Sequence, residues 1–154
     1  MRKAMLLLAV FGLAGSLWAA DPIIGTWKRN ISESKADASI KEHVEIYREL
    51  DSGQIELTLT INYSNGFQAR WKYTWPAQGG VAKRFQGPPR EGNILEIETL
   101  ISPGEWILTR MQDGKQYNSI YKIISKDGKT MRQTASGKSL RGSSYEGFSV
   151  FDKQ

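Results

Sequence analysis

Apolar and polar residues alternate with a period of two through most of this chain, which is typical of β-strands with one buried face. The clearest alternation runs over 54–63, where Ile55, Leu57 and Leu59 share one face. Asn65-Gly66 follows it, and Asn-Gly between two alternating segments favours a tight hairpin turn. Comparable turn signals recur at Asp51-Ser52-Gly53, Pro103-Gly104, Asp113-Gly114 and Asp127-Gly128. The pattern therefore predicts consecutive antiparallel strands joined by short turns.

The alternating segments predict an all-β fold of about ten strands, with no helix long enough for the crossover that parallel strands need. Consecutive antiparallel strands form an up-and-down meander, and a meander of this size usually closes into a barrel. We expect a barrel of about 8–10 strands, which is roughly the size that holds one small ligand. A two-sheet sandwich would show the same alternation and is the alternative fold.

Residues 1–19 predict a secretory signal peptide. Arg2 and Lys3 form a positive start, and an apolar run over 4–17 is followed by small residues. Cleavage at the end of this segment would leave 20–154 as a single domain without a transmembrane anchor. The chain has no Cys, which excludes a lipid-modified N-terminal Cys as well as disulfides. We therefore expect a secreted or periplasmic bacterial protein that is not a lipoprotein.

The charged residues point to no nucleic-acid partner, metal or cofactor. The chain carries a formal net charge of +5 at pH 7, and its basic residues alternate with acidic ones along most of the sequence. His43 is the only histidine, so a zinc site or a Ser-His-Asp triad would depend on it alone. We expect His43 to be exposed and without function. The sequence therefore predicts a non-catalytic, monomeric protein.

Phrases at both ends of the 20–154 segment resemble lipocalin-like proteins. Gly25-Thr26-Trp27 resembles the Gly-x-Trp signature of the lipocalin and fatty-acid-binding-protein group. The longer phrases Ile24–Asn30 and Ser125–Met131 resemble small secreted bacterial lipocalin-like proteins. The resemblance implies a calycin-like barrel in the bacterial envelope.

Gly25 and Trp27 are predicted to have structural roles on the first strand. We expect Trp27 to close one end of the barrel, packed under a cationic side chain from a late strand. Arg132 and Arg141 are the two candidates for this cation.

An aromatic face on the strand after the Asn-Gly turn predicts the ligand contacts. Phe67, Trp71, Tyr73 and Trp75 share this face, and one face of each barrel strand points inward. Aromatic side chains with polar handles suit a cavity for an amphipathic ligand. Tyr121 is expected on the comparable face of a neighbouring strand. A filled core without a cavity is the alternative interpretation.

Two arginines are candidate anchors for a ligand carboxylate, because a guanidinium offers a fork of donors. They are Arg110 and Arg132, and the lipid-binding barrels that this sequence resembles use such an Arg. The alternative for each is a position at the rim or in solvent. Glu96 and Glu98 share the more polar face of their strand and are predicted to face solvent. The Gly- and Pro-rich segment 86–93 is predicted as a lid or a plain loop at the open mouth.

The expected function is the binding of a small apolar or amphipathic molecule in the barrel interior, without catalysis. The first alternative is a structural or interaction module of the bacterial envelope with a filled core. The second is an enzyme that uses Tyr and Arg in the cavity as acid and anchor. A cavity of a few hundred Å³ would favour binding, and a buried Tyr–Arg or Glu–Arg cluster would favour the enzyme.

Overall fold

The computed structural model describes residues 21–35, 38–138 and 143–154, so the predicted signal peptide and Arg141 lie outside the described residues. The described residues form eleven β-strands and no helix. None of them forms a helix with the length and apolarity to cross a membrane. The strands are β1 (Gly25–Lys35), β2 (Ile40–Glu49), β3 (Gln54–Tyr63), β4 (Gln68–Pro76), β5 (Gly79–Val81), β6 (Lys83–Gln86), β7 (Ile94–Ser102), β8 (Glu105–Gln112), β9 (Lys115–Ile124), β10 (Thr130–Lys138) and β11 (Ser144–Lys153).

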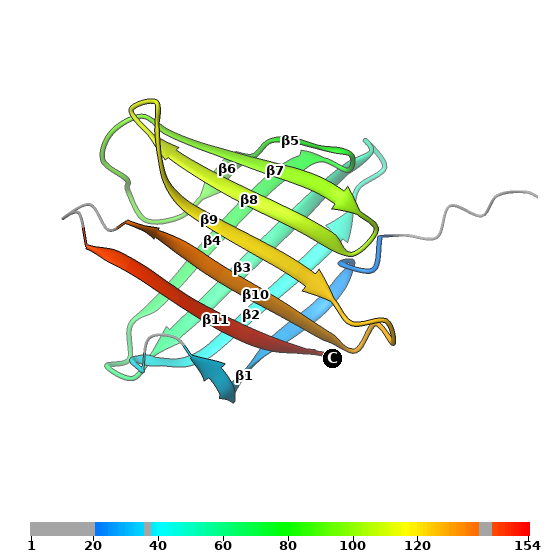
Figure 1. Ribbon diagram of the computed structural model, residues 1–154, viewed down its shortest axis with the longest axis horizontal. Coiled ribbons are helices and arrows are strands. Elements are labelled where there is room, and N and C mark those ends of the chain that lie inside the picture. Colours follow the sequence, from blue (N-terminus) through cyan, green and yellow to red (C-terminus); the bar gives the residue numbers. More distant parts are fainter. Residues whose placement is uncertain (1–20, 36–37, 139–142) are drawn as a thin grey trace, which may run out of the picture.

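All eleven strands belong to one antiparallel sheet, ordered β5-β7-β8-β9-β10-β11-β1-β2-β3-β4-β6. The first and last strands of the chain lie side by side within it, because Trp27 on β1 is paired with Glu45 on β2 and with Lys153 on β11. In Figure 1 the strands β7–β11 therefore lie in front of β2–β4. The short strand β5 also contacts β4, so the barrel is nearly closed. The predicted all-β meander is confirmed, and the two shortest strands lie in its least regular segment.

Turn chemistry fixes where these strands begin and end. Between β3 and β4, Gly66 has a φ of 83°, a left-handed conformation that glycine adopts without steric cost. Asn65 Oδ1 accepts a hydrogen bond from the Phe67 amide at 2.9 Å, which holds the same turn. The alternating register on both strands follows from this hairpin, since Ile55 pairs with Trp75 and Leu59 with Trp71.

Trp27 closes one end of the barrel. Its side chain is fully buried, and its Nε1 donates a hydrogen bond to the Ile23 carbonyl at 2.7 Å. The cation above it is Lys153, whose Nζ lies 5.0 Å from the centre of the indole. Gly25 leaves room for that lysine, because a Cβ there would lie 2.7 Å from Lys153 Cε. The prediction of Arg132 as this cation is wrong, since it lies on the outer face of β10.

The apolar core fills the barrel beside Trp27. Trp75 makes edge-to-face contacts with Tyr47 and Trp106, at 6.2 and 6.3 Å between ring centres. These rings pack with four further side chains that are at most 1% exposed, namely Ile23, Ile55, Met131 and Phe151. This end of the interior, which we call the closed end, is therefore dry and apolar.

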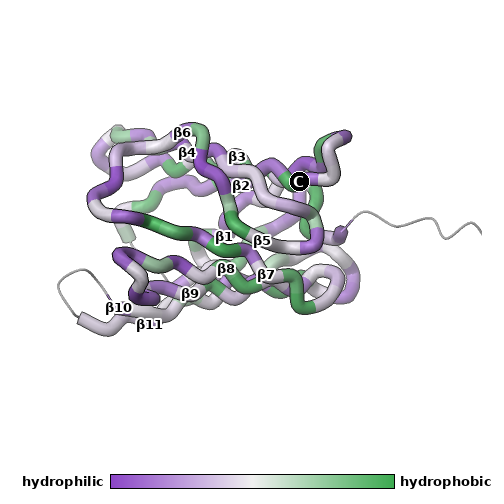
Figure 2. The backbone as a smooth tube through the Cα atoms, turned by 90° about the horizontal axis from the view of Figure 1, so that it is seen from above, coloured by the Kyte–Doolittle hydropathy of each residue, from purple (hydrophilic) through white to green (hydrophobic). Residues whose placement is uncertain are grey.

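Beyond the closed end, charged side chains face inward. Hydrophilic and hydrophobic residues alternate along the strand traces in Figure 2. The buried side chains are not the apolar ones on every strand. On β7, Glu96 and Glu98 are 4% and 3% exposed, so the prediction that they face solvent is wrong. On β2 the same is true of His43, whose side chain is only 11% exposed. The barrel interior therefore continues as a polar compartment.

Candidate ligand cavity

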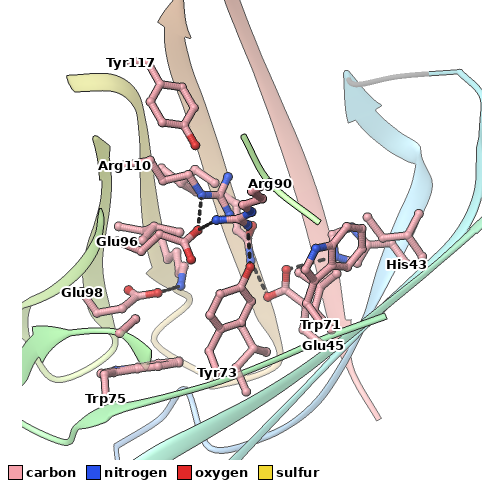
Figure 3. A pocket seen from close by; sticks show the side chains of 18 residues that line it. His43, Glu45, Trp71, Tyr73, Trp75, Arg90, Glu96, Glu98, Arg110 and Tyr117 are labelled. Carbon is pink, nitrogen blue, oxygen red and sulfur yellow. Dashed lines mark hydrogen bonds and ion pairs between the residues drawn. The ribbon is translucent and has the colours of Figure 1, made fainter. Parts of the chain in front are cut away.

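A cavity of about 310 Å³ lies inside the barrel next to the closed end. Strands β2, β3 and β4 line one side, strands β7 to β10 line the other, and Arg90 enters from the loop between β6 and β7 (Figure 3). The apolar part of its wall consists of Leu57, Leu59, Ile61, Trp71, Trp75, Ala82, Leu108 and Ile120. The cavity can therefore take up apolar surface over much of its wall.

The rest of the wall is ionisable. Three carboxylates and three cations line the cavity together with His43, and these are Glu45, Glu96, Glu98, Arg90, Arg110 and Lys122. Charges this deeply buried are stable only when they are paired and hydrogen-bonded. Within the described ranges, no group of three or more His, Cys, Asp and Glu side chains is placed to hold a metal ion.

Glu96 is the centre of a cluster with two arginines. Its Oε1 lies 2.8 Å from Arg110 Nε and 3.0 Å from Arg90 Nη1, and both guanidinium groups point toward it in Figure 3. Arg90 Nη2 also donates a hydrogen bond to the Tyr73 hydroxyl at 2.6 Å. Two cations on one carboxylate leave a surplus positive charge. We call these four residues the arginine cluster.

Within the arginine cluster, the pKa values of Arg110 and Tyr73 are both raised. Burial alone would lower the pKa of Arg110, but the charge and hydrogen bond of Glu96 raise it above its ordinary value. Burial and the charge of Glu96 raise the pKa of Tyr73 against the opposing effect of Arg90. Tyr73 is therefore a neutral phenol at neutral pH, and Arg110 is charged.

Glu45 forms a second polar group on the opposite wall. Its Oε2 accepts hydrogen bonds from the Tyr47 hydroxyl at 2.5 Å and from Gln133 Nε2 at 2.7 Å. Its Oε1 lies 3.1 Å from His43 Nε2, within ion-pair distance. Burial would raise the pKa of Glu45, but His43, Lys122 and Tyr47 together lower it from 4.5 to about 2. Glu45 is therefore ionised, with two hydrogen bonds on Oε2 and the His43 ring close to Oε1.

Glu98 and Lys122 form the most buried ion pair. Lys122 Nζ lies 2.8 Å from Glu98 Oε1, and the two side chains are 4% and 3% exposed. The same ammonium lies 5.5 Å from the centre of the Tyr47 ring and 5.7 Å from that of Trp75. Glu98 Oε2 and Trp75 Nε1, in contrast, are buried and have no hydrogen-bond partner among the described residues.

Four of the residues predicted from the sequence to bind a ligand line this cavity, and they are Trp71, Tyr73, Trp75 and Arg110. Three others lie outside it. Phe67 precedes β4, is 56% exposed and packs on Tyr63, with ring centres 5.8 Å apart. Arg132 lies on the outer face of β10, over the Phe148 ring at 4.1 Å.

Tyr121 is the third predicted residue outside the cavity, with 37% of its surface exposed. It pairs with Ile107 on β8, next to the inward pair of Leu108 and Ile120, so it lies on the outward face. Tyr117 lines the cavity although it is four residues from Tyr121 on the same strand, because a β-bulge lies between them, where Arg110 pairs with Asn118 whereas Met111 pairs with Gln116. The expected inward position of Tyr121 is therefore wrong.

The sequence reasoning missed most of the polar wall, namely His43, Glu45, Arg90, Glu96, Glu98, Lys122 and Gln133. One signal could have found part of it. Arg110 shares the face of Trp106 and Leu108, and folding the hairpin about Pro103-Gly104 brings Glu96 opposite Arg110. An arginine on an apolar face with a glutamate directly across from it indicates a buried ion pair.

Comparison with known proteins supports the fold but shows no relationship at the level of sequence. No protein-family model and no curated protein sequence matches this chain. The crystal structure of the wild-type fluorescent protein UnaG is similar, with a TM-score of 0.60, 11% sequence identity, and coverage of 88% of this chain and 100% of that one. A variant of UnaG gives a TM-score of 0.61 at 11% identity, covering 88% and 99%. The nearly closed antiparallel meander and these similarities show that the chain has a lipocalin-like, calycin-type β-barrel fold.

Proposed function

We propose that this protein binds a small amphipathic molecule inside its barrel. The observation that carries the proposal is the cavity of about 310 Å³, whose wall combines apolar side chains with buried, ionised groups. Its volume is at the lower end of the range for ligand pockets, roughly 300–1,000 Å³. A filled core, the alternative expected of an interaction module, would leave no such volume. We also propose that binding takes place outside the cytoplasm, on the strength of the predicted signal peptide.

The apolar part of the ligand would lie against Trp71 and the leucines of β3, where burial of apolar area supplies the affinity. An anionic group such as a carboxylate would lie at the arginine cluster. Arg90 and Arg110 share the single carboxylate of Glu96, so their surplus charge and remaining N–H donors favour an anion. Arg110 is therefore the proposed anchor in place of Arg132.

We propose binding without covalent chemistry. The cluster of Tyr73, Arg90 and Glu96 is the feature that would favour an enzyme. A raised pKa makes Tyr73 a weak proton donor, however, and a pKa of about 2 makes Glu45 a poor base. These groups are better suited to hold fixed charges than to move protons.

Isothermal titration calorimetry with fatty acids of increasing length, starting at octanoate, tests the proposal. We expect saturable binding to the purified protein. Arg110→Gln should weaken it roughly tenfold or more, because a charge-assisted hydrogen bond contributes about 1.5–3 kcal/mol. Arg132→Gln is the matched control, since it removes an arginine from the outer face and should leave the affinity unchanged. The absence of binding across the series by a folded protein would refute the proposal.

A further inference from the structure

We propose that the cavity contains a second polar subsite, made by Trp75 and Glu98, for a neutral group that both donates and accepts a hydrogen bond. A hydroxyl or a primary amide has this chemistry. The inference rests on the proposed function. It adds a prediction about the chemistry of the ligand at the end remote from its anionic group. The ligand class is then an anion with a hydroxyl or amide group at a distance from its charge.

Two buried polar atoms without partners carry the inference. Trp75 Nε1 is a donor and Glu98 Oε2 is an acceptor, and neither has a hydrogen-bond partner among the described residues. Both residues line the cavity and are at most 3% exposed. Native proteins leave few buried polar atoms unpaired, because each one is costly. A ligand group in the cavity would satisfy both.

Trp75 and Glu98 lie in the same part of the cavity. Lys122 Nζ lies 2.8 Å from Glu98 Oε1 and 5.7 Å from the centre of the Trp75 ring, so both side chains flank the same ammonium. Figure 3 shows them below the arginine cluster, on the side of the pocket formed by β4 and β7. One small ligand group is therefore assigned to both the donor and the acceptor.

The charges at this place favour a neutral group. Lys122 already neutralises Glu98 at 2.8 Å, so a ligand cation would compete with a buried ammonium for the same carboxylate. An anion would face the carboxylate of Glu98 directly. What remains is hydrogen-bonding capacity, with one donor and one acceptor, and a hydroxyl complements both.

The spacing from the anion anchor follows from β7. Glu96, in the arginine cluster, and Glu98 are two residues apart on the inward face of this strand. Two residues of an extended strand span about 7 Å. The ligand should therefore carry its hydroxyl or amide several carbon atoms away from its anionic group.

Paired probes test the subsite. Octanoate and 8-hydroxyoctanoate differ only in the terminal hydroxyl, and calorimetry gives the ratio of their dissociation constants. In the unmodified protein we expect the hydroxy acid to bind roughly threefold to tenfold more tightly, the gain of about one net hydrogen bond. Trp75→Phe keeps an aromatic ring and removes the Nε1–H, so it should reduce the preference while octanoate still binds, because the hydroxyl then keeps only Glu98 Oε2 as a partner.

Trp106→Phe is the matched control. Trp106 Nε1 is also buried without a partner, but Trp106 does not line the cavity, so this variant should keep the preference for the hydroxy acid. If Trp75→Phe does not fold, the double variant Lys122→Met/Glu98→Leu replaces it, because it removes the acceptor together with its cation, and the preference should fall. Equal binding of the two probes to the unmodified protein, or loss of the preference in Trp106→Phe, overturns the subsite and leaves the proposed function standing. If neither probe nor any longer fatty acid binds, the proposed function itself fails.

Discussion

The closed end and the cavity are buried to the same degree, but they are built from opposite kinds of side chain. Trp27 and Phe151 at the closed end are 0% exposed, and Glu96 and Glu98 in the cavity are 4% and 3% exposed. At the closed end burial itself stabilises the fold, because it removes apolar area from water. In the cavity burial opposes folding, and partners must offset the loss of hydration. A barrel that needed only a core would not contain the second arrangement, which is why the cavity points to a ligand.

Trp75 lies at the boundary between these two regions. One side of its environment is the closed end, where its ring meets Trp106 edge to face. The other side is the cavity, where Lys122 Nζ lies 5.7 Å from the same ring. The difference between the regions can therefore be tested with variants that affect one side at a time.

The largest effect is expected from Trp27→Ala at the closed end. The variant removes a fully buried indole, its hydrogen bond to the Ile23 carbonyl and its contact with Lys153. Loss of a buried tryptophan should lower the free energy of unfolding by about 4 kcal/mol, measured by urea denaturation.

Trp71→Ala is the matched variant on the cavity side. Trp71 lines the cavity and is only partly buried, so its loss should lower the free energy of unfolding by roughly 2 kcal/mol or less. It should weaken the binding of octanoate more than it weakens the fold. Equal losses of stability in Trp27→Ala and Trp71→Ala would show that the closed end has no special part in holding the barrel together.

A smaller effect is expected from Lys122→Met in the cavity. The variant leaves the buried carboxylate of Glu98 without its ammonium partner, which should lower the free energy of unfolding by about 3 kcal/mol. The double variant Lys122→Met/Glu98→Leu removes both charges and should recover most of that loss. Urea denaturation of the two variants gives the comparison.

The control for this pair lies on the outside of the barrel. Lys72 and Glu56 are also 2.8 Å apart, but their side chains are 40% and 17% exposed. Lys72→Met should therefore change the stability by less than about 1 kcal/mol. If the double variant in the cavity is as unstable as Lys122→Met alone, the unpaired charge of Glu98 is not the cause of the loss.

The contrast between the two regions also explains which parts of the structure could be predicted from the sequence alone. The closed end could be predicted, because Gly25 and Trp27 form a recognisable phrase and apolar alternation such as that of 54–63 indicates buried faces. On β7 the alternation is equally clear, but the inward face carries Glu96 and Glu98. A charged residue on an alternating strand has the same period whether it faces water or a polar cavity. Only its partner across the barrel determines which way it faces.

Which polar residues pair with one another in the cavity could not be predicted from the sequence, for the same physical reason. Glu45 accepts hydrogen bonds from Tyr47 and from Gln133, which is 88 positions away along the chain. Arg90 comes from a Gly- and Pro-rich loop, where no periodicity indicates a direction. Only the register across the closed barrel brings such residues together. The bulge at Tyr117 adds a local change of face that no repeating pattern contains.

The third effect is a dependence of stability on pH that should arise mainly from Glu45 in the cavity. Glu45 is fully buried, and its pKa is lowered from 4.5 to about 2 in the folded protein, where His43, Lys122 and Tyr47 stabilise the ionised form. The unfolded chain therefore binds this proton more readily than the folded one, so the stability that Glu45 contributes is complete above about pH 5 and is lost as the pH falls toward 2. The loss amounts to about 3 kcal/mol at most.

In Glu45→Gln, urea denaturation between pH 6 and 2 should show a flatter curve of stability against pH, which meets that of the unmodified protein at low pH. Glu42→Gln is the control, because its pKa is also lowered, by Lys28 and Asn62, but at the exposed surface, where solvent screens the interaction, so its curve should flatten much less than that of Glu45→Gln. An unchanged acid slope in Glu45→Gln would mean that burial in the cavity does not set the acid sensitivity of this barrel.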